Sequence, residues 1–340
     1  MIKVAINGFG RIGRAFLRMS HEREDIEIVA INDLGSPESM AYLLRYDTVY
    51  GHSAFTVDHA EGKLIVAERD IVLTNEKDPA NLPWGKLGID VVVESTGIFT
   101  SYEKANAHIT AGAKKVVITA PVKADPAGGS VAGETILIGA NEEKFGTCNI
   151  TSNASCTTNA ASPLIGILKE KLGIKKALLN TVHAYTASQA LVDGPSKKDL
   201  REGRAAAQNI VPSTTGAAIA TTMAYPDLVG KFDGISIRVP VAVGSIVDVT
   251  FLAGRATTVE EVNNILKEAA SDPHWSRVFT VTEEPLVSSD IIGARFGAIA
   301  DLGMTQVVDG DLVKVLAWYD NEASYVHTLI EHVTETAKHL

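Results

Sequence analysis

The chain has few of the features that mark membrane, secreted or metal-binding proteins. Two cysteines among 340 residues are too few for a disulfide framework. No apolar run approaches the roughly 18 residues needed to span a bilayer. The start, MIKVAING, lacks the layout of a signal peptide. The nine histidines show no HExxH spacing, and no CxxC occurs, so we expect no metal site. These absences favour a cytoplasmic protein.

Positive charge is also scarce, so the protein as a whole should not attract polyanionic binding partners. With a net charge of −10, the chain has no general attraction for nucleic acid or for an anionic membrane. Any anionic ligand must therefore be held by a local site. Apolar residues make up 46% of the chain and charged residues 21%, which is ordinary for a globular protein. A length of 340 residues predicts one large or two medium domains.

The first half of the chain alternates between strand and helix patterns. Apolar spacing predicts a helix at residues 11–20. Apolar, β-branched runs predict strands at residues 3–7, 26–31, 89–93, 115–118 and 136–138. Continuous apolar strands separated by helices are typical of a parallel sheet buried on both faces. We therefore expect an α/β fold that begins with a parallel-sheet domain.

The pattern changes after Cys156, where longer strand runs indicate an α+β domain with a mixed, largely antiparallel sheet. The predicted strands are residues 177–182, 234–239 and 245–253, and the predicted helices are residues 162–171, 258–270 and 325–338. Residues 123–130 and the polar stretch 188–208 are expected to form loops. We therefore predict two domains, residues 1–154 and residues 155–320.

A glycine-rich motif predicts a nucleotide site in the first domain. Gly8, Gly10 and Gly13 match GxGxxG between the first strand and the first helix. They permit a tight turn, the approach of a pyrophosphate to the backbone and close packing of the helix on the strand. Asp33 ends the next strand, where its carboxylate can bind ribose hydroxyls and disfavour a 2′-phosphate. The pattern indicates a Rossmann-type domain that prefers NAD. Asp33 as a turn residue and Arg11 as a solvated helix-start residue are the simpler alternatives.

Cys156 lies in SNASCTTN, where a strand pattern gives way to a helix pattern. Free N–H groups and the dipole at a helix start favour a thiolate, so we expect this thiol to ionise easily and to act as a nucleophile. A buried structural cysteine is the alternative. His183 follows a predicted strand and could take the thiol proton, although a lone histidine is often structural.

Hydroxyl and cationic residues further along the chain offer donors to phosphate. Arg238 can supply a charged fork. The other candidate donors are Thr157, Thr214, Thr215 and Gly216. Some of them could merely cap helices, but a capped helix N-terminus is also an anion site.

These segments together resemble the phosphorylating glyceraldehyde-3-phosphate dehydrogenase family (type I). The matching motifs follow the family order along nearly the whole chain: NGFGRIGR, IND, ESTGIFT, SNASCTTN, HAYT, RAAAQNIVPSTTGAA, IRVPV and WYDNE.

The resemblance implies an NAD-dependent oxidation of D-glyceraldehyde 3-phosphate to 1,3-bisphosphoglycerate in glycolysis and gluconeogenesis. The reaction would pass through a thiohemiacetal and a thioester on Cys156, with His183 as the base. The subunits would form a homotetramer, and the C-terminal helix, about residues 321–340, would pack on the first domain. By resemblance, NAD would be bound by Gly8, Gly10, Arg11, Ile12, Gly13, Asp33, Thr119 and Asn321. The substrate phosphate and inorganic phosphate would be bound by Ser155, Thr157, Thr186, Thr215, Gly216 and Arg238.

The chain departs from the family pattern at a few positions. Ala160 stands where many members have a second cysteine, and Ile219 replaces a lysine. Glu202 stands where some bacterial members have a phosphate-binding arginine, and Ala323 and Ser324 replace tryptophan and glycine. These changes leave the chemistry intact but leave open the affinity for phosphate and the fine substrate preference.

Several alternatives remain at this point. NADP is a weaker alternative as cofactor, and erythrose 4-phosphate is an alternative aldehyde. A hydrolase or acyltransferase that uses the same thiol without redox chemistry, and a non-catalytic binding module, are the other classes. Neither class would change the absorbance of a nicotinamide.

Overall fold

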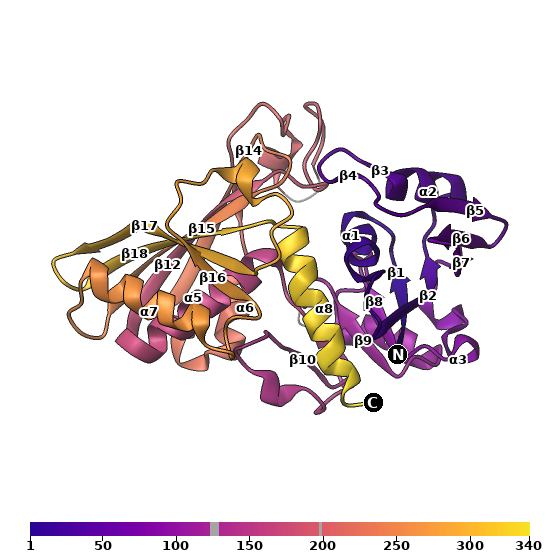
Figure 1. Ribbon diagram of the computed structural model, residues 1–340, viewed down its shortest axis with the longest axis horizontal. Coiled ribbons are helices and arrows are strands. Elements are labelled where there is room, and N and C mark those ends of the chain that lie inside the picture. The colour runs from indigo at the N-terminus through magenta and orange to yellow at the C-terminus, as the bar shows by residue number, and fades with distance from the viewer. Residues whose placement is uncertain (123–128, 197–198) are drawn as a thin grey trace. The chain divides into compact units, whose positions relative to one another are not determined.

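The computed structural model describes residues 1–122, 129–196 and 199–340, and its contacts divide the chain into two units (Figure 1). Unit 1 consists of Met1–Ile136, Asn141–Ala154 and Leu329–Leu340, and unit 2 of Leu137–Ala140 and Ser155–Thr328. Most of the loop predicted at 123–130 lies outside the described residues, as do residues 197 and 198. Within the described ranges, no helix has the length and apolar character that crossing a membrane requires.

Unit 1 is built on a nine-stranded sheet of described residues. Its strands are β1 (Ile2–Asn7), β2 (Ile26–Asn32), β5 (Val57–Ala60), β6 (Lys63–Val66), β7 (Arg69–Thr74), β8 (Val91–Glu94), β9 (Lys115–Ile118), β10 (Gly133–Thr135) and β11 (Ile150–Ser152). The order is β10-β11-β9-β8-β1-β2-β7-β6-β5. All neighbours from β10 to β7 pair in parallel, whereas β6 and β5 are antiparallel. The parallel sheet predicted for this part of the chain is confirmed.

The described part of unit 1 also contains four α-helices that lie wholly within it and a short hairpin. The helices are α1 (Arg11–Ser20), α2 (Pro37–Arg45), α3 (Trp84–Leu87) and α4 (Tyr102–Thr110), and the hairpin joins β3 (Tyr46–Asp47) to β4 (Gly51–His52). Helix α1 has the predicted bounds and buries Phe16 and Leu17. The strand predicted at 136–138 is wrong. These residues are buried, but the strand in this region is β10, and the chain leaves unit 1 after Ile136. Residues 136–138 are apolar because they are buried, although they do not form a strand.

Unit 2 contains a seven-stranded sheet among its described residues. Its strands are β12 (Ile174–Ala184), β13 (Val211–Thr214), β14 (Phe232–Val239), β15 (Ser245–Ala253), β16 (Phe279–Thr282), β17 (Ala298–Val308) and β18 (Leu312–Tyr319). The order is β13-β14-β12-β15-β18-β17-β16, with parallel pairs only at β12–β14 and β16–β17. The prediction of a mixed, largely antiparallel sheet is confirmed.

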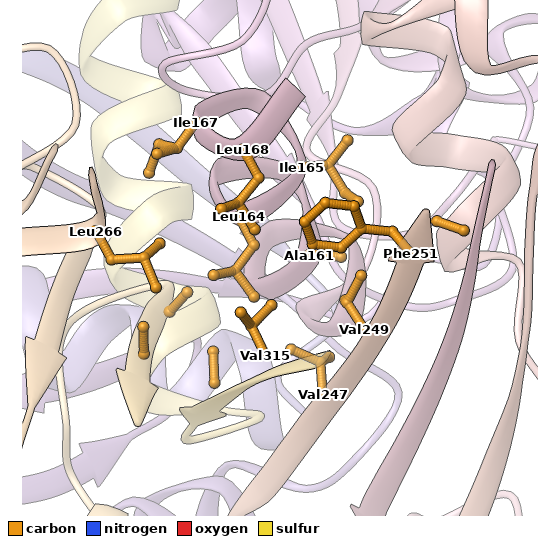
Figure 2. Close-up of a cluster of buried hydrophobic side chains, with 14 of the residues drawn as sticks. Ala161, Leu164, Ile165, Ile167, Leu168, Val247, Val249, Phe251, Leu266 and Val315 are labelled. Carbon is orange, nitrogen blue, oxygen red and sulfur yellow. The ribbon is translucent and has the colours of Figure 1, made fainter. Parts of the chain in front are cut away.

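The core of unit 2 lies between this sheet and its longest helix. The helices are α5 (Cys156–Leu172), α6 (Ala217–Ala224), α7 (Val259–Ser271) and α8 (Ala323–Ala337), of which α8 runs from unit 2 into unit 1. Figure 2 shows buried apolar side chains of α5 gathered with those of β15, β18 and α7, including Leu164, Ile165, Leu168, Val247, Phe251, Leu266 and Val315. Each such side chain contributes roughly 1.5–3 kcal/mol on burial. This packing anchors the helix whose first residue is Cys156.

The unit 1 portion of α8 is held by a buried histidine. His332 is fully buried, its Nε2 lies 2.7 Å from the Thr151 hydroxyl, and its ring meets the Phe145 ring edge-on at 4.9 Å. Burial lowers the pKa of His332 to about 3 from its ordinary 6.5. The imidazole is therefore neutral in the folded protein at neutral pH.

Acid should accordingly weaken unit 1. Below pH 6.5 the unfolded chain binds a proton at His332 that the folded chain does not bind until about pH 3, so the unfolding free energy falls as the pH drops through that window. His332→Gln should make the fall shallower in denaturant titrations between pH 7 and 4. His59→Gln, on an exposed strand, is the control. Equal slopes for H332Q and the parent protein would contradict the assignment.

Candidate active site

Cys156 is the first residue of α5 and follows the end of β11 by a short turn, as the sequence pattern predicted. Ala154 in that turn has a φ of 51°, a region that favours glycine, so the backbone before the cysteine is strained. Ser155 caps the helix, because its hydroxyl accepts a hydrogen bond from the Thr158 N–H at 3.2 Å. The cap uses the N–H of Thr158, so the N–H groups before it in the helix can donate to the sulfur or to an anion beside it.

Strand pairing brings two charged or titratable side chains to the sulfur. His183 and Arg238 are direct partners in the register of the parallel strands β12 and β14, near the carboxyl end of each. Nε2 of His183 lies 3.4 Å from Sγ of Cys156. Nη1 of Arg238 contacts Nδ1 of His183. The structure therefore joins three of the residues predicted from the sequence into one cluster.

The hydrogen bonds around His183 indicate its tautomer. Nδ1 lies 2.7 Å from the Ala184 carbonyl oxygen, so Nδ1 carries the proton and donates it. Nη1 of Arg238 lies 3.4 Å from the same oxygen and also donates to it. The contact with Nη1 of Arg238 would suit an unprotonated Nδ1, but this Nη1 also has the Ala184 carbonyl as an acceptor. The proton on Nδ1 satisfies the Ala184 carbonyl at the shorter distance and leaves Nε2, which faces the thiol, as the nitrogen that can accept a proton.

The protonation states differ from the sequence-based expectation. Burial raises the pKa of Cys156, although the charge of Arg238 and hydrogen bonds from Thr157 oppose it. Burial, followed by the charge of Arg238, lowers the pKa of His183 to about 3. The prediction that this thiol ionises easily is wrong for the ligand-free site, because shielding from water outweighs the helix start. The pair is a neutral thiol beside a neutral imidazole.

Arg238 has the features of a residue that binds an anion. In the described part of the chain it forms no ion pair with a carboxylate, and its buried Nε has no hydrogen-bond partner. A buried donor without a partner costs about 1–3 kcal/mol. An anionic group that accepted hydrogen bonds from this guanidinium would remove the cost.

Tyr319 is a site residue to which the sequence analysis gave no role. Its hydroxyl is fully buried and lies 2.8 Å from the Thr157 hydroxyl and 2.8 Å from the Thr181 hydroxyl. Its ring meets the His183 ring edge-on, with centroids 5.9 Å apart. The available signal was its place in the motif WYDNE; the alternation of burial along β18, which directs Tyr319 inward, is visible only in the structure.

The other predicted phosphate residues make local hydrogen bonds. The Thr186 hydroxyl pairs with that of Ser188 at 3.1 Å, and the Thr215 hydroxyl accepts from the Ala217 N–H at 3.2 Å. Gly216 is exposed and precedes α6. Within the described ranges, none of these three residues forms a hydrogen bond with Cys156. Glu202 accepts a hydrogen bond at 3.2 Å from the hydroxyl of Ser213, which lies in β13, the strand that leads to Thr215.

A separate cavity in unit 1 contains the predicted nucleotide motif. It has a volume of about 510 Å³ and is lined by Asn7, Gly8, Gly10, Asn32, Asp33, Leu34, Glu76, Lys77, Ser95, Thr96, Ile98 and Phe99. Gly8 has a φ of 95°, and a Cβ on Gly13 would come within 2.3 Å of the Gly8 carbonyl oxygen. A Cβ on Gly10 would meet no protein atom within 4 Å. Gly10 thus leaves open the space beside the start of α1 that a pyrophosphate needs.

The residues predicted to bind the nucleotide in unit 1 have partners within the protein. The Asp33 carboxylate accepts hydrogen bonds from the Phe9 N–H at 2.7 Å and the Gly35 N–H at 2.8 Å. Asp33 therefore has the structural role that was the simpler alternative, and free lone pairs remain for a ligand. The Thr119 hydroxyl donates to the Glu94 carbonyl at 3.0 Å, and Arg11 forms an ion pair with Asp47. Ile12 is partly buried on α1.

Asn321 lies in unit 2, and its orientation is settled by its neighbours. Its side-chain oxygen accepts hydrogen bonds from the Gly244 N–H and the Ser245 hydroxyl, each at 3.1 Å. The amide NH₂ is consequently the end that can donate to a ligand. No three His, Cys, Asp or Glu side chains in the described ranges are grouped as a metal site.

Comparison with known proteins decides the family. The family model described as "Glyceraldehyde 3-phosphate dehydrogenase, NAD binding domain" matches residues 2–102, and that described as "Glyceraldehyde 3-phosphate dehydrogenase, C-terminal domain" matches residues 155–321. The chain belongs to the glyceraldehyde-3-phosphate dehydrogenase family. The catalytic-domain match begins at Ser155, the cap of the helix that starts with Cys156.

Curated relatives cover nearly the whole chain. A glyceraldehyde-3-phosphate dehydrogenase of Streptomyces coelicolor is 47% identical over 333 residues, which are 97% of each chain. One from Clostridium acetobutylicum is 46% identical and covers 99% of each chain. One from Geobacillus stearothermophilus is 44% identical over 97% of this chain and 96% of the relative.

Two departures from the family pattern can be placed in the structure. Ala160 is fully buried in α5, and both cysteines of the chain are free. Ile219 is 60% exposed on α6, so the usual lysine is replaced on a surface that does not pack in the core.

Proposed function

We propose that the chain oxidises D-glyceraldehyde 3-phosphate to 1,3-bisphosphoglycerate with NAD and inorganic phosphate. The observation that carries the proposal is the cluster of Cys156, His183 and Arg238, a nucleophile, a base and a cation without an anionic partner. Family membership and the names of the relatives favour glyceraldehyde 3-phosphate over erythrose 4-phosphate as the aldehyde.

The first step is attack of the sulfur on the aldehyde carbon. Nε2 of His183 takes the thiol proton as the C–S bond forms, and the imidazolium returns it to the developing oxyanion to give a thiohemiacetal. The neutral imidazole beside a neutral thiol suits this coupled transfer. N–H groups at the start of α5 stabilise the oxyanion.

Oxidation and phosphorolysis complete the cycle. A bound nicotinamide dinucleotide supplies the hydride acceptor. His183 removes the hydroxyl proton of the thiohemiacetal, and the carbon becomes a thioester. A phosphate oxygen then attacks the thioester carbonyl, the C–S bond breaks, and the acyl phosphate leaves a thiolate that is reprotonated. Arg238 and the hydroxyls of Ser155, Thr157, Thr186 and Thr215, with the backbone of Gly216, are the proposed phosphate ligands.

The residues of unit 1 fit a dinucleotide. The cavity reaches the start of α1, and a side chain at Gly10 would fill open space there. We assign Arg11 and Ile12 to the pyrophosphate region, Asp33 to the ribose, and Thr119 and Asn321 to the nicotinamide end. Because Asp33 would repel a 2′-phosphate, NAD is the preferred cofactor and NADP the weaker one.

The proposal is tested by following nicotinamide absorbance during turnover. Reduction of NAD should require both glyceraldehyde 3-phosphate and phosphate, and erythrose 4-phosphate should be turned over more slowly. Equal rates without phosphate would exclude an acyl phosphate product. No absorbance change with any aldehyde would instead favour a non-redox use of the thiol.

Asp33→Asn should weaken the preference for NAD. The substitution keeps the shape but removes the charge, so we expect the KM for NAD to rise about tenfold and the KM for NADP to fall. Steady-state kinetics with both cofactors measures the change. Glu76→Gln removes another carboxylate from the same cavity and is the control. An unchanged NAD/NADP ratio in D33N would show that Asp33 only holds the backbone turn.

We further propose a cytoplasmic homotetramer. Leu191, Val192 and Leu200 on the polar loop are 80%, 73% and 85% exposed, which is costly for large apolar side chains in a monomer. Two free cysteines also suit a reducing compartment. Sedimentation equilibrium would show a single-subunit mass if the tetramer proposal is wrong.

A further inference from the structure

A row of three buried hydroxyl groups lies behind the nucleophile. Thr157, Tyr319 and Thr181 come from α5, β18 and β12, and their exposed fractions are 4%, 0% and 1%. The Tyr319 hydroxyl bridges the two threonine hydroxyls with distances of 2.8 Å on both sides. At the far end, the Thr181 hydroxyl donates to the Ile246 carbonyl at 3.2 Å. We call these three residues the hydroxyl chain.

The near end of the hydroxyl chain lies next to the nucleophile in the sequence, because Thr157 follows Cys156 in the first turn of α5. The Thr157 hydroxyl and backbone N–H favour the ionised form of Cys156, although burial outweighs them and raises the pKa of the thiol. The chain thus runs from a carbonyl oxygen, which can only accept, toward a sulfur atom, which accepts when it is a thiolate.

The hydroxyl chain has two consistent arrangements of its protons. In the first, Thr157 donates to Tyr319, Tyr319 to Thr181, and Thr181 to the Ile246 carbonyl. In the second, Thr181 donates to Tyr319, Tyr319 to Thr157, and Thr157 to the sulfur. Each hydroxyl has one proton, so Tyr319 cannot donate in both directions. The first arrangement leaves no hydroxyl donor for the sulfur, and the second supplies one in addition to the backbone N–H groups at the start of α5.

We propose that the hydroxyl chain turns its three protons toward Sγ of Cys156 when the thiolate forms, and that Tyr319 is the positioning residue that couples the two threonines. The thiol proton passes to Nε2 of His183, and no bond between heavy atoms changes in this step. Hydrogen bonds in such a chain polarise one another, so each donor strengthens the next. The inference rests on the proposed function only in taking Cys156 as the nucleophile.

The tyrosine has a second contact that must be separated from its hydroxyl. Its ring packs edge-on against His183 at 5.9 Å and helps to hold the imidazole. Tyr319→Phe keeps the ring and removes the hydroxyl alone. Thr181→Val breaks the same chain one step further from the sulfur while keeping the side-chain shape.

The test is the pH dependence of the alkylation of Cys156 by iodoacetamide, in a Cys148→Ser background so that one thiol reports. We expect Y319F to raise the pH midpoint of alkylation and to slow the reaction about tenfold at neutral pH. T181V should also raise the pH midpoint of alkylation and slow the reaction at neutral pH. The double variant should resemble Y319F, because the chain is already broken.

Tyr225→Phe is the matched control. This tyrosine is also in unit 2, burial raises its pKa to about 12, and its hydroxyl donates to the Ser162 carbonyl at 3.3 Å. Its alkylation profile should match that of the parent. If Y319F and the parent gave the same profile, or if Y225F shifted as far as Y319F, the proposal would be overturned. If Y319F did not fold, T181V would decide between the same two results.

The assay uses no aldehyde, phosphate or dinucleotide. Failure of the proposed function would leave the alkylation result standing, and a flat result for Y319F would leave the dehydrogenase activity standing. A loss of kcat in Y319F with an unchanged KM for NAD would add that the hydroxyl chain acts during turnover.

Discussion

Cys156→Ser should lower kcat for phosphate-dependent NAD reduction by at least about 10³-fold. Burial already raises the pKa of the thiol, and a serine hydroxyl in the same shielded place is far harder to ionise. In the proposed mechanism the Cys156 sulfur also forms the thioester, which is more reactive toward phosphate than the ester that serine would form. The measurement is steady-state reduction of NAD with glyceraldehyde 3-phosphate and phosphate.

The other cysteine provides the matched control. Cys148 is free and partly buried in unit 1, and its thiol donates to the Ile150 carbonyl at 3.2 Å. Cys148→Ser should keep kcat within about twofold, since that hydrogen bond can be made by a hydroxyl. NAD binding should be retained in both C156S and C148S, because neither substitution changes the glycine motif. More than a tenth of the parent kcat in C156S would mean that another group carries the acyl intermediate.

The candidate site residues whose positions depend on a short segment of the chain could be predicted without a structure. The glycine motif and Asp33 depend on a strand, a turn and a helix within a short segment, and the structure has these elements where the pattern indicated them. Cys156 was found for the same reason, since a helix start is visible as a change of period. Such features depend on neighbours in the chain.

The electrostatics of the thiol could not be found in this way. They depend on how deeply α5 is packed and on Arg238 and His183, which only strand register makes neighbours. A sequence displays the helix start, which lowers a thiol pKa, but not the burial, which here raises it. The neutral state of the pair follows from tertiary packing.

Tyr319 was missed for a related reason. It ends the strand LVKVLAWY, whose almost entirely apolar sequence does not show which side chains face inward, and its partners Thr157 and Thr181 lie on two other elements. The wrong strand at 136–138 has the opposite origin. Three apolar residues suggested a ladder, but these residues are buried where the chain crosses between the two units. An apolar run indicates that its residues are buried, but it indicates only indirectly that they pair with a neighbouring strand.

His183→Asn should lower kcat by about 10² to 10⁴-fold. The parent base is unprotonated across the working pH range, because burial and Arg238 bring its pKa to about 3. Its Nε2 lone pair is therefore available across that range, and in the proposed mechanism it takes the thiol proton as the C–S bond forms. In the asparagine variant the proton must go to water, so alkylation of Cys156 should need a higher pH, while the rate at high pH stays near that of the parent. Parallel kcat and alkylation profiles measure both effects.

His274→Asn is the control for this substitution, since that ring is also in unit 2 and its Nε2 lies 2.7 Å from the Gly139 carbonyl oxygen and not beside the thiol. It should leave both profiles unchanged. A loss of kcat in H183N without a shift in alkylation would mean that His183 holds the substrate oxygen but does not take the thiol proton. A shift in alkylation with kcat retained would mean that proton transfer to His183 does not limit turnover. The paired thiol and base predict that both change together, because a single nitrogen, Nε2, faces the sulfur.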